Sequence, residues 1–330
     1  MQLTEQAHAA ALIELGWSSF FGDQVGEDEA GLVPVRIAYI HRTRMSGHSP
    51  DGSVDLALPA PSNTSDYAVG DFVLAEPGGL LVRRRLARRS LLTRRLADGS
   101  TQLSAANIDT LFVVTSCNNE FNVARLERYL AMASQAQITP VLVLTKADTA
   151  DDAAAFVAQA AELARDLSVI VVDPRRPDAL SRPQSWFSLG KTAALTGSSG
   201  VGKSTLVNTL VASALVKGNA PAQFERMIPR GHTTTARSLH AVAGGGWVLD
   251  SPGIRTLHLS EMEEGLDSVF AEITDLATHC KFSDCTHSHE PSCAVLAAVG
   301  RGEVDTARHA RWRRLHDENS AGKMPRPRRR

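Results

Sequence analysis

The pattern of apolar and polar positions first indicates a β-rich region. After a short helix that we expect to end near Gly16, short and mostly alternating apolar runs are separated by turn signals. These runs predict strands at 32–40, 54–58, 70–76 and 80–84. Short strands at close spacing are typical of a small β-barrel, of which the five-stranded oligonucleotide-binding (OB) barrel is one kind. The same residues also allow an undefined β-domain.

Strand and helix patterns alternate in the next region, which follows a polar segment at 97–107. The sequence predicts strands at 108–116, 140–148, 168–173 and 245–253, helices at 123–135 and 153–167, and a strand, Gly-rich turn and helix over 191–211. Such alternation predicts a parallel sheet with helices on both faces, and ligands of these sheets bind at the carboxyl ends of the strands. From Ser260 onward we expect helices around a cysteine cluster.

Charge is unevenly distributed, although the net charge of the 330 residues is only −1. Seven arginines and no acidic residue lie between Arg83 and Arg95, and the tail 323–330 carries five more positive charges. Basic stripes are electrostatic footprints for phosphate backbones, and a solvated surface is the alternative. The N-terminus lacks the basic start of a secretory signal, and no apolar run approaches the ~18 residues of a membrane span. We therefore expect a cytoplasmic protein without membrane contact.

A phosphate-binding loop is the strongest motif. GSSGVGKST fits G-x-x-x-x-G-K-[ST] between an expected strand and an expected helix, which disfavours the alternative of a plain Gly-rich turn. Backbone N–H groups would surround the α- and β-phosphates, Lys203 would reach the β- and γ-phosphates, and Ser204 would ligate Mg²⁺. The expected nucleotide contacts in this loop are Gly197, Ser198, Ser199, Gly200, Val201, Gly202, Lys203, Ser204 and Thr205.

A guanine-recognition motif, TKAD, precedes this loop by about fifty residues and consists of Thr145, Lys146, Ala147 and Asp148. The carboxylate of Asp148 would accept hydrogen bonds from guanine N1–H and N2–H₂, which selects GTP over ATP. The stem of Lys146 can cover the base, and Thr145, where asparagine is usual, can supply a tethering hydrogen bond. Ordinary GTPases have the phosphate loop first, so the order here predicts a circularly permuted fold.

Two further segments supply candidate Mg²⁺ ligands. In DSPG, Asp250 would hold Mg²⁺ through water and the Gly253 N–H would meet the γ-phosphate, although a common turn has the same composition. In HTTTAR, Thr234 would close on Mg²⁺ only when the γ-phosphate is present, which makes the segment a switch. Thr233 and Thr235 are alternatives for this role, and a polar edge strand is the structural alternative.

No glutamine follows DSPG, where Ras-like GTPases orient the attacking water. His232 is the local candidate for that catalytic role, with a structural histidine as the alternative.

Three cysteines and a histidine form the spacing C-x₄-C-x-H-x₅-C. Three thiolates and one imidazole make a closed tetrahedral site, which is the usual form of structural zinc. His279 and His289 are alternative imidazoles, and free buried cysteines are the other interpretation. The expected ligands are Cys280, Cys285, His287 and Cys293.

Taken together, these motifs in this order resemble the small-ribosomal-subunit-dependent GTPase family RsgA, also called YjeQ. GDFV at 70–73, the arginine-rich 83–95 and FNVARLERYLAMA at 121–133 extend the resemblance over nearly the whole chain. The resemblance implies GTP hydrolysis stimulated by the small ribosomal subunit, in late maturation of that subunit, with rRNA and GTP or GDP as partners. It also implies the zinc ligand set above and a catalytic histidine at His232.

Some positions depart from the family pattern. Thr145 replaces the usual asparagine, and Arg230 and Gly231 precede the histidine where the family commonly has G-x-H-T-T. The family often contacts guanine through a Ser-Ala pair after the strand at 168–173, for which VDPRRPDAL has no clear equivalent.

The resulting architecture is multidomain α/β, and we expect a monomer. We assign an N-terminal helical extension at 1–29, an OB-fold RNA-binding domain at 30–102, a circularly permuted GTPase domain at 103–259, a helical zinc-binding domain at 260–318 and a basic disordered tail at 319–330. Two other hypotheses are a non-enzymatic RNA-binding assembly protein, favoured by the missing glutamine, and an ATP-dependent kinase or ATPase with the same loop.

Overall fold

The N-terminal strands close into a ring. The computed structural model describes residues 2–95, 100–176, 179, 181, 183–216, 237–250 and 262–323. The first of the ring's five strands pairs antiparallel with the second and with the fourth. A parallel bridge between Ala57 and Leu81 joins the end of the third strand to the start of the fifth and closes the ring. Val35, Ile37 and Val73 are fully buried inside. The strands are β1 (Val33–His41), β2 (Arg44–Ser49), β3 (Gly52–Leu56), β4 (Phe72–Ala75) and β5 (Val82–Arg85).

Three strands of this region escaped the sequence prediction. β2 has the sequence RMSGHS, whose few apolar residues do not alternate, and it forms by pairing with β1 and β3. β6 (Leu91–Arg95) lies in the arginine-rich segment and β7 (Thr101–Ala106) in the predicted polar segment 97–107, and the two pair antiparallel as a separate hairpin. Here the backbone hydrogen bonds of a neighbouring strand outweigh weak local patterning. The specific OB-fold assignment stays a prediction.

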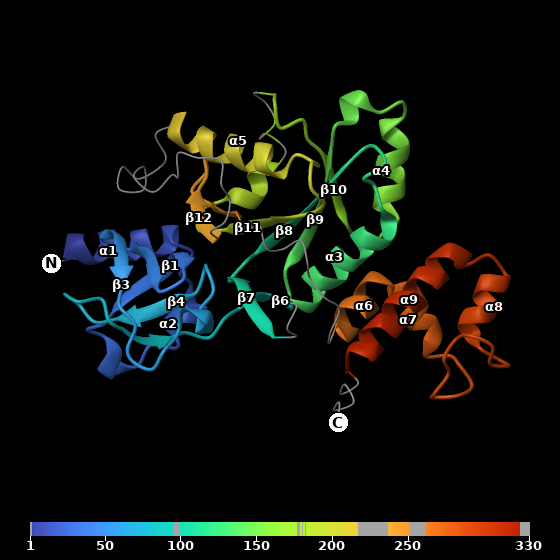
Figure 1. The fold of residues 1–330 in the computed structure, drawn as a ribbon, viewed down its shortest axis with the longest axis horizontal. Coiled ribbons are helices and arrows are strands. Elements are labelled where there is room, and N and C mark those ends of the chain that lie inside the picture. Colours follow the sequence, from blue (N-terminus) through green and yellow to red (C-terminus); the bar gives the residue numbers. More distant parts are fainter. Residues whose placement is uncertain are drawn as a thin grey trace.

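The nucleotide-binding region has the predicted parallel sheet. Its order is β10-β9-β8-β11-β13, with β12 antiparallel to β13. Leu111 and Val113 of β8 pack with helices α3 and α4, while Phe112 and Val114 pack with α5, so helices cover both faces (Figure 1). The elements are β8 (Thr110–Ser116), α3 (Val123–Gln135), β9 (Thr139–Thr145), α4 (Ala153–Ala161), β10 (Ser168–Val171), β11 (Thr192–Thr196), α5 (Lys203–Val216), β12 (Arg237–Ala241) and β13 (Trp247–Asp250). α4 is shorter than the predicted 153–167.

The two strand systems are joined edge to edge. β1 pairs antiparallel with β12, so one sheet of eleven strands runs through the described residues, which the sequence did not predict. Beside this joint the buried Arg36 donates to Leu15 O (2.8 Å) and to Thr192 Oγ1 (2.7 Å), and burial lowers its pKa to about 10. Helices α1 (Gln2–Glu14) and α2 (Ser19–Gly22) precede the strands.

The C-terminal helices dock on α3. Gly265 lies so close to this helix that an added Cβ would be 2.0 Å from the carbonyl oxygen of Ala131, and the Gly265 N–H donates to Gln135 Oε1. The helices are α6 (Glu263–Val269), α7 (Ala271–Ala277), α8 (Ala294–Gly300) and α9 (Thr306–Lys323). Among the described residues, no helix combines the length and apolarity that crossing a membrane requires. The domain boundaries given above stay predictions.

Candidate functional site

The phosphate loop connects β11 to α5 in a conformation that requires its glycines. Gly197, Gly200 and Gly202 have φ angles of 137°, 79° and 97°, which L side chains rarely adopt. A Cβ on Gly197 would lie 2.0 Å from Val114 O, at the end of the neighbouring strand β8. The Lys203 ammonium group donates to Gly197 O (2.8 Å) and to Ser198 O, so it lies over the loop. Loop, lysine and helix N-terminus form an anion-binding arrangement.

The guanine motif lies at the carboxyl end of β9, directly beside this loop. Thr145 is 1% exposed, and its hydroxyl oxygen lies 2.6 Å from Val201 O and 3.1 Å from Thr115 O. A hydroxyl has a single hydrogen, so it donates to one of these carbonyls at a time. The threonine therefore tethers the guanine motif to the phosphate loop across 56 residues of chain.

Asp148 has a partner that the sequence analysis did not name. Arg175, in the loop after β10, donates from Nη2 to Asp148 Oδ2 at 2.8 Å. The same guanidinium is held by Asp173, through Nε at 2.8 Å and Nη2 at 2.9 Å, and these two carboxylates raise the pKa of Arg175. The sequence offered only one hint of this contact. VDPRR follows the strand that pairs with the strand ending in TKAD, so the two loops leave the same edge of the sheet.

The remaining nucleotide ligands are only partly described. Ser204 is exposed in the first turn of α5, and the backbone of Asp250 ends β13, whose Leu249 lies opposite Ala194 of β11. Both residues are thus at the phosphate-loop edge of the sheet. Three predicted positions, His232, Thr234 and Gly253, lie outside the described residues, and so do the alternatives Thr233 and Thr235.

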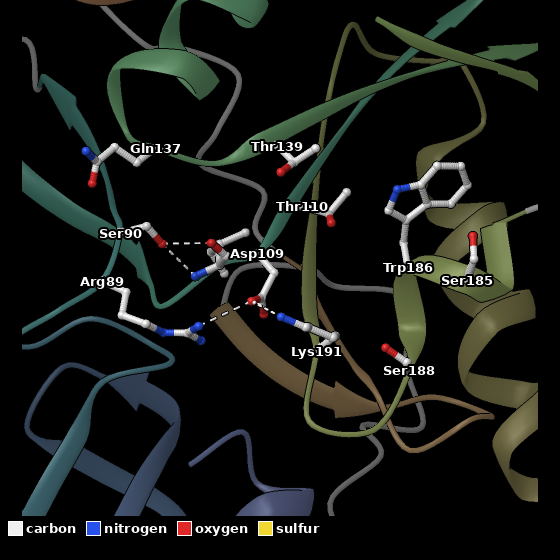
Figure 2. A pocket seen from close by; sticks show the side chains of 11 residues that line it. Arg89, Ser90, Asp109, Thr110, Gln137, Thr139, Ser185, Trp186, Ser188 and Lys191 are labelled. Carbon is white, nitrogen blue, oxygen red and sulfur yellow. Dashed lines mark hydrogen bonds and ion pairs between the residues drawn. The ribbon is translucent and has the colours of Figure 1, made fainter. Parts of the chain in front are cut away.

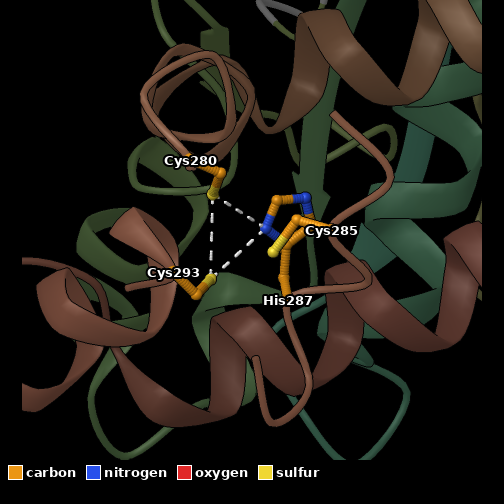
Figure 3. Close-up of side chains that lie close together, drawn as sticks. All are labelled: Cys280, Cys285, His287 and Cys293. Atoms are coloured by element: carbon orange, nitrogen blue, oxygen red, sulfur yellow. Dashed lines mark hydrogen bonds between the residues drawn. The ribbon is translucent and has the colours of Figure 1, made fainter. Parts of the chain in front are cut away.

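Three cysteines and one histidine of the C-terminal region converge in space (Figure 3). Their ligand atoms all lie within 4.8 Å of one another. His287 Nδ1 is 3.5 Å from the sulfurs of Cys280 and Cys293, and these two sulfurs are 3.8 Å apart. Tetrahedral zinc has bonds of about 2.3 Å to sulfur and about 2.0 Å to nitrogen. This geometry requires about 3.6 Å between a ligand nitrogen and a sulfur and about 3.8 Å between two sulfurs. The set Cys280, Cys285, His287 and Cys293 therefore fits a four-coordinate metal ion.

Local structure arranges this cluster. The carboxylate of Glu290 accepts hydrogen bonds from the backbone N–H groups of Thr286 and Ser288 (both 3.0 Å), which folds the loop between the ligands. Burial lowers the pKa of His287 and so favours the neutral imidazole that a metal requires. The alternative His279 instead bonds through Nδ1 to Asp275 O at 3.0 Å, and neither it nor His289 belongs to the cluster.

The arginine stripe at 83–95 is largely paired within the protein. Four of its side chains contact carboxylates: Arg83–Glu76, Arg84–Glu29, Arg88–Asp71 and Arg89–Asp109. Arg85 and Arg94 contact no carboxylate in the part of the chain that the structure describes, and the side chain of Arg95 is outside it. Much of the charge that suggested a phosphate footprint is therefore already paired with carboxylates of the same chain.

A hollow of about 530 Å³ opens at the opposite edge of the sheet, where β8, β9 and β11 begin. Asp109 lies in its wall and contacts Lys191 Nζ (3.1 Å) and Arg89 Nη1 (3.5 Å), and Trp186 lines the hollow on the side away from Arg89 (Figure 2). None of the predicted nucleotide or metal ligands lines it. The nucleotide motifs that the structure describes thus lie at the carboxyl edge.

The fold and this edge define a P-loop GTPase in which the guanine motif comes before the phosphate loop. The RsgA GTPase family model matches residues 85–260. The chain belongs to the RsgA GTPase family.

Two curated relatives and two solved structures agree with this assignment. The small ribosomal subunit biogenesis GTPase RsgA of Mesorhizobium japonicum is 57% identical over 95% of this chain and 91% of its own. The small ribosomal subunit biogenesis GTPase RsgA 2 of Vibrio vulnificus is 40% identical over 94% of this chain and 88% of its own. The crystal structure of YjeQ from Thermotoga maritima has a similar fold, with a TM-score of 0.64 and 21% identity over 87% of this chain and 98% of its own. The crystal structure of YloQ, a circularly permuted GTPase, has a TM-score of 0.62 and 22% identity over 92% of this chain and 99% of its own.

Proposed function

We propose that this chain hydrolyses GTP and acts in the late maturation of the small ribosomal subunit, as a monomer in the cytoplasm. The relatives named above support the assignment through their names. The observation that carries it is the 2.6 Å contact between Thr145 Oγ1 and Val201 O. This contact joins a guanine-reading motif to a phosphate-binding loop, which is the arrangement that GTP binding requires.

Each site residue has a proposed role. Asp148 accepts from the guanine edge, the loop 197–205 surrounds the phosphates, and Lys203 neutralises their charge. Ser204, Thr234 and Asp250 hold Mg²⁺, Gly253 contacts the γ-phosphate, and His232 acts in catalysis. Thr234 would leave the metal when the γ-phosphate is lost, so hydrolysis would release the switch.

We propose that the N-terminal ring of strands is an OB-type barrel that contacts rRNA. Arg85, at the end of β5, and Arg94, in the β6–β7 hairpin that follows the ring, support this role, because neither is neutralised by a carboxylate among the described residues. Such uncompensated charges bind phosphate oxygens more readily than paired ones do. For the cysteine cluster we propose one structural zinc ion, because four protein ligands leave no open coordination position.

The test is the GTPase rate with and without purified small ribosomal subunits. We expect slow basal hydrolysis that rises steeply when subunits are added. His232→Ala should lose the stimulation while retaining GTP affinity. A rate that subunits leave unchanged would refute the proposal.

Asp148→Asn tests the guanine site separately. The amide oxygen and NH₂ match xanthine better than guanine, so GTP should bind about 100-fold more weakly and XTP more tightly. Asp151→Asn, which makes the same chemical change on the exposed surface nearby, is the control and should leave both affinities unaltered. Equal GTP affinities for the two variants would exclude Asp148 from base recognition.

A further inference from the structure

We propose that Arg175 is a specificity-determining residue that reads the O6 atom of guanine beside Asp148. This inference rests on the proposed guanine site. The geometry behind it is the 2.8 Å contact between Arg175 Nη2 and Asp148 Oδ2, which places a guanidinium directly next to the carboxylate that accepts from the base.

The arginine is held in place by its own loop. Asp173 accepts from Arg175 Nε and Nη2, and its Oδ1 also accepts from the Arg175 backbone N–H at 3.1 Å. Between these two residues, Pro174 O accepts from Thr209 Oγ1 of α5 at 2.8 Å. A side chain that is fixed in advance loses little freedom on binding, although Arg175 is exposed.

The same loop borders the nucleotide site on its base side. A Cβ placed on Gly202, in the phosphate loop, would lie 3.8 Å from both the Pro174 ring and the Thr145 side chain. The segment 173–175 thus lies between the guanine motif and the helix that follows the phosphate loop. This is where the family resemblance led us to expect a guanine contact and where no residue could be named from the sequence.

The donor and acceptor groups complement guanine. Its edge presents an acceptor, O6, followed by two donors, N1–H and N2–H₂. Asp148 supplies acceptors, and Asp148 and Asp173 take up only the Nε and Nη2 donors of Arg175. Among the described residues Nη1 has no hydrogen-bond acceptor, and its N–H groups can donate to O6. Adenine carries an NH₂ group at that position, so the guanidinium would also disfavour ATP.

Binding of three nucleotides can distinguish a direct contact of Arg175 with O6 from a role in which Arg175 only orients Asp148. GTP and ITP both have O6, and ITP lacks the N2 amino group. The triphosphate of 2-aminopurine riboside keeps the amino group and lacks O6. Affinities would be measured on the full chain by displacement of a ribose-labelled fluorescent GDP, for the unaltered protein and for Arg175→Ala and Arg175→Lys.

We expect Arg175→Ala to weaken GTP and ITP by about tenfold each and to leave the 2-aminopurine nucleotide unchanged, because one charge-assisted hydrogen bond is lost. Arg175→Lys should recover part of the loss. The control Arg176→Ala removes an equal charge from the next residue and should have no effect. A loss of equal size for all three nucleotides would mean that Arg175 only orients Asp148, and no loss would mean that it does not contact the base. Either result overturns the proposal.

These outcomes are distinct from failure of the proposed guanine site. If the unaltered chain binds ATP as tightly as GTP, the guanine site itself is wrong. If it prefers GTP and Arg175→Ala retains that preference and affinity, only the role of Arg175 is wrong.

Discussion

At the residue scale, one hydroxyl links the two halves of the nucleotide site. Thr145 takes the place of an asparagine, whose NH₂ group has two hydrogens and could serve both Val201 O and Thr115 O at once. The threonine serves them alternately. The substitution therefore keeps the tether between guanine motif and phosphate loop with one hydrogen bond fewer.

Thr145→Val should lower GTP affinity about fivefold to tenfold and destabilise the fold by about 1–2 kcal/mol, because two buried carbonyls lose their donor without a change of side-chain shape. Calorimetric titration with GTP and urea unfolding would measure the two effects. The control is Thr139→Val, the same substitution at the exposed, opposite end of β9. If both variants bind GTP alike, the Thr145 hydroxyl does not organise the site.

The contact between Arg175 and Asp148 could not be predicted from sequence motifs. Asp148 follows an apolar strand within a short motif, and the role proposed for it follows from guanine chemistry. The arginine belongs to no motif, and only the spatial neighbourhood of the loops after β9 and β10 brings it to Asp148.

At the element scale, the C-terminal region consists of short helices arranged around the metal-binding cluster. α7 and α8 have seven residues each, and such short helices are marginal on their own. Cys293 is the N-cap of α8 and accepts from Leu296 N at 3.4 Å, so a metal ligand also starts a helix. A metal ion at the cluster would thus connect the loop 280–293 to the helices.

Removing the metal should loosen these helices selectively. We expect one zinc ion per chain in the purified protein, and Cys285→Ser or a strong chelator should abolish it and lower the thermal midpoint. Metal analysis and circular dichroism would measure both. Cys117→Ser, a buried thiol outside the cluster, should keep the full zinc content. A Cys285→Ser protein that retains one zinc ion would contradict the assigned ligand set.

At the scale of the whole molecule, a charge network around one buried carboxylate joins helix α3 to the C-terminal helices. Glu127 of α3 is fully buried and contacts two arginines of α9: Arg311 Nε lies 2.9 Å from Oε2 and Arg308 Nη1 lies 3.1 Å from Oε1. Arg308 also donates to Leu163 O and Val269 O, so one side chain contacts three parts of the chain.

Glu127→Ala should destabilise the protein by about 2–3 kcal/mol, because it leaves Arg311 without a carboxylate partner and Arg308 with Glu272 as its remaining one. The control is Glu318→Ala. Glu318 also lies on α9, and its carboxylate contacts Arg128 of α3 at a more exposed position. The cost of this substitution should stay below about 1 kcal/mol. Urea unfolding of both variants measures the difference, and equal costs would show that the Glu127 network does not hold the two regions together.

The sequence by itself determined the local chemistry of this protein. Glycines at fixed spacing, the TKAD carboxylate after an apolar strand and the Cys₃His cluster are short-range patterns, and their chemistry needs only neighbouring residues. The parallel sheet, the helix at 123–135 and the permuted order could be predicted for the same reason. The predicted positions at 232–235 and 251–253 lie outside the described residues and stay predictions.

Only the tertiary structure decided how distant segments meet. The edge-to-edge pairing of β1 with β12, the contact between Arg84 and Glu29 and the contact between Arg175 and Asp148 join residues far apart in the chain. The strands β2, β6 and β7 pair with strands close to them in sequence, but no local alternation of apolar residues marks them. Backbone hydrogen bonds and ion pairs are satisfied by whichever partner the packed fold brings near. No local pattern specifies that partner, so its identity became visible only in three dimensions.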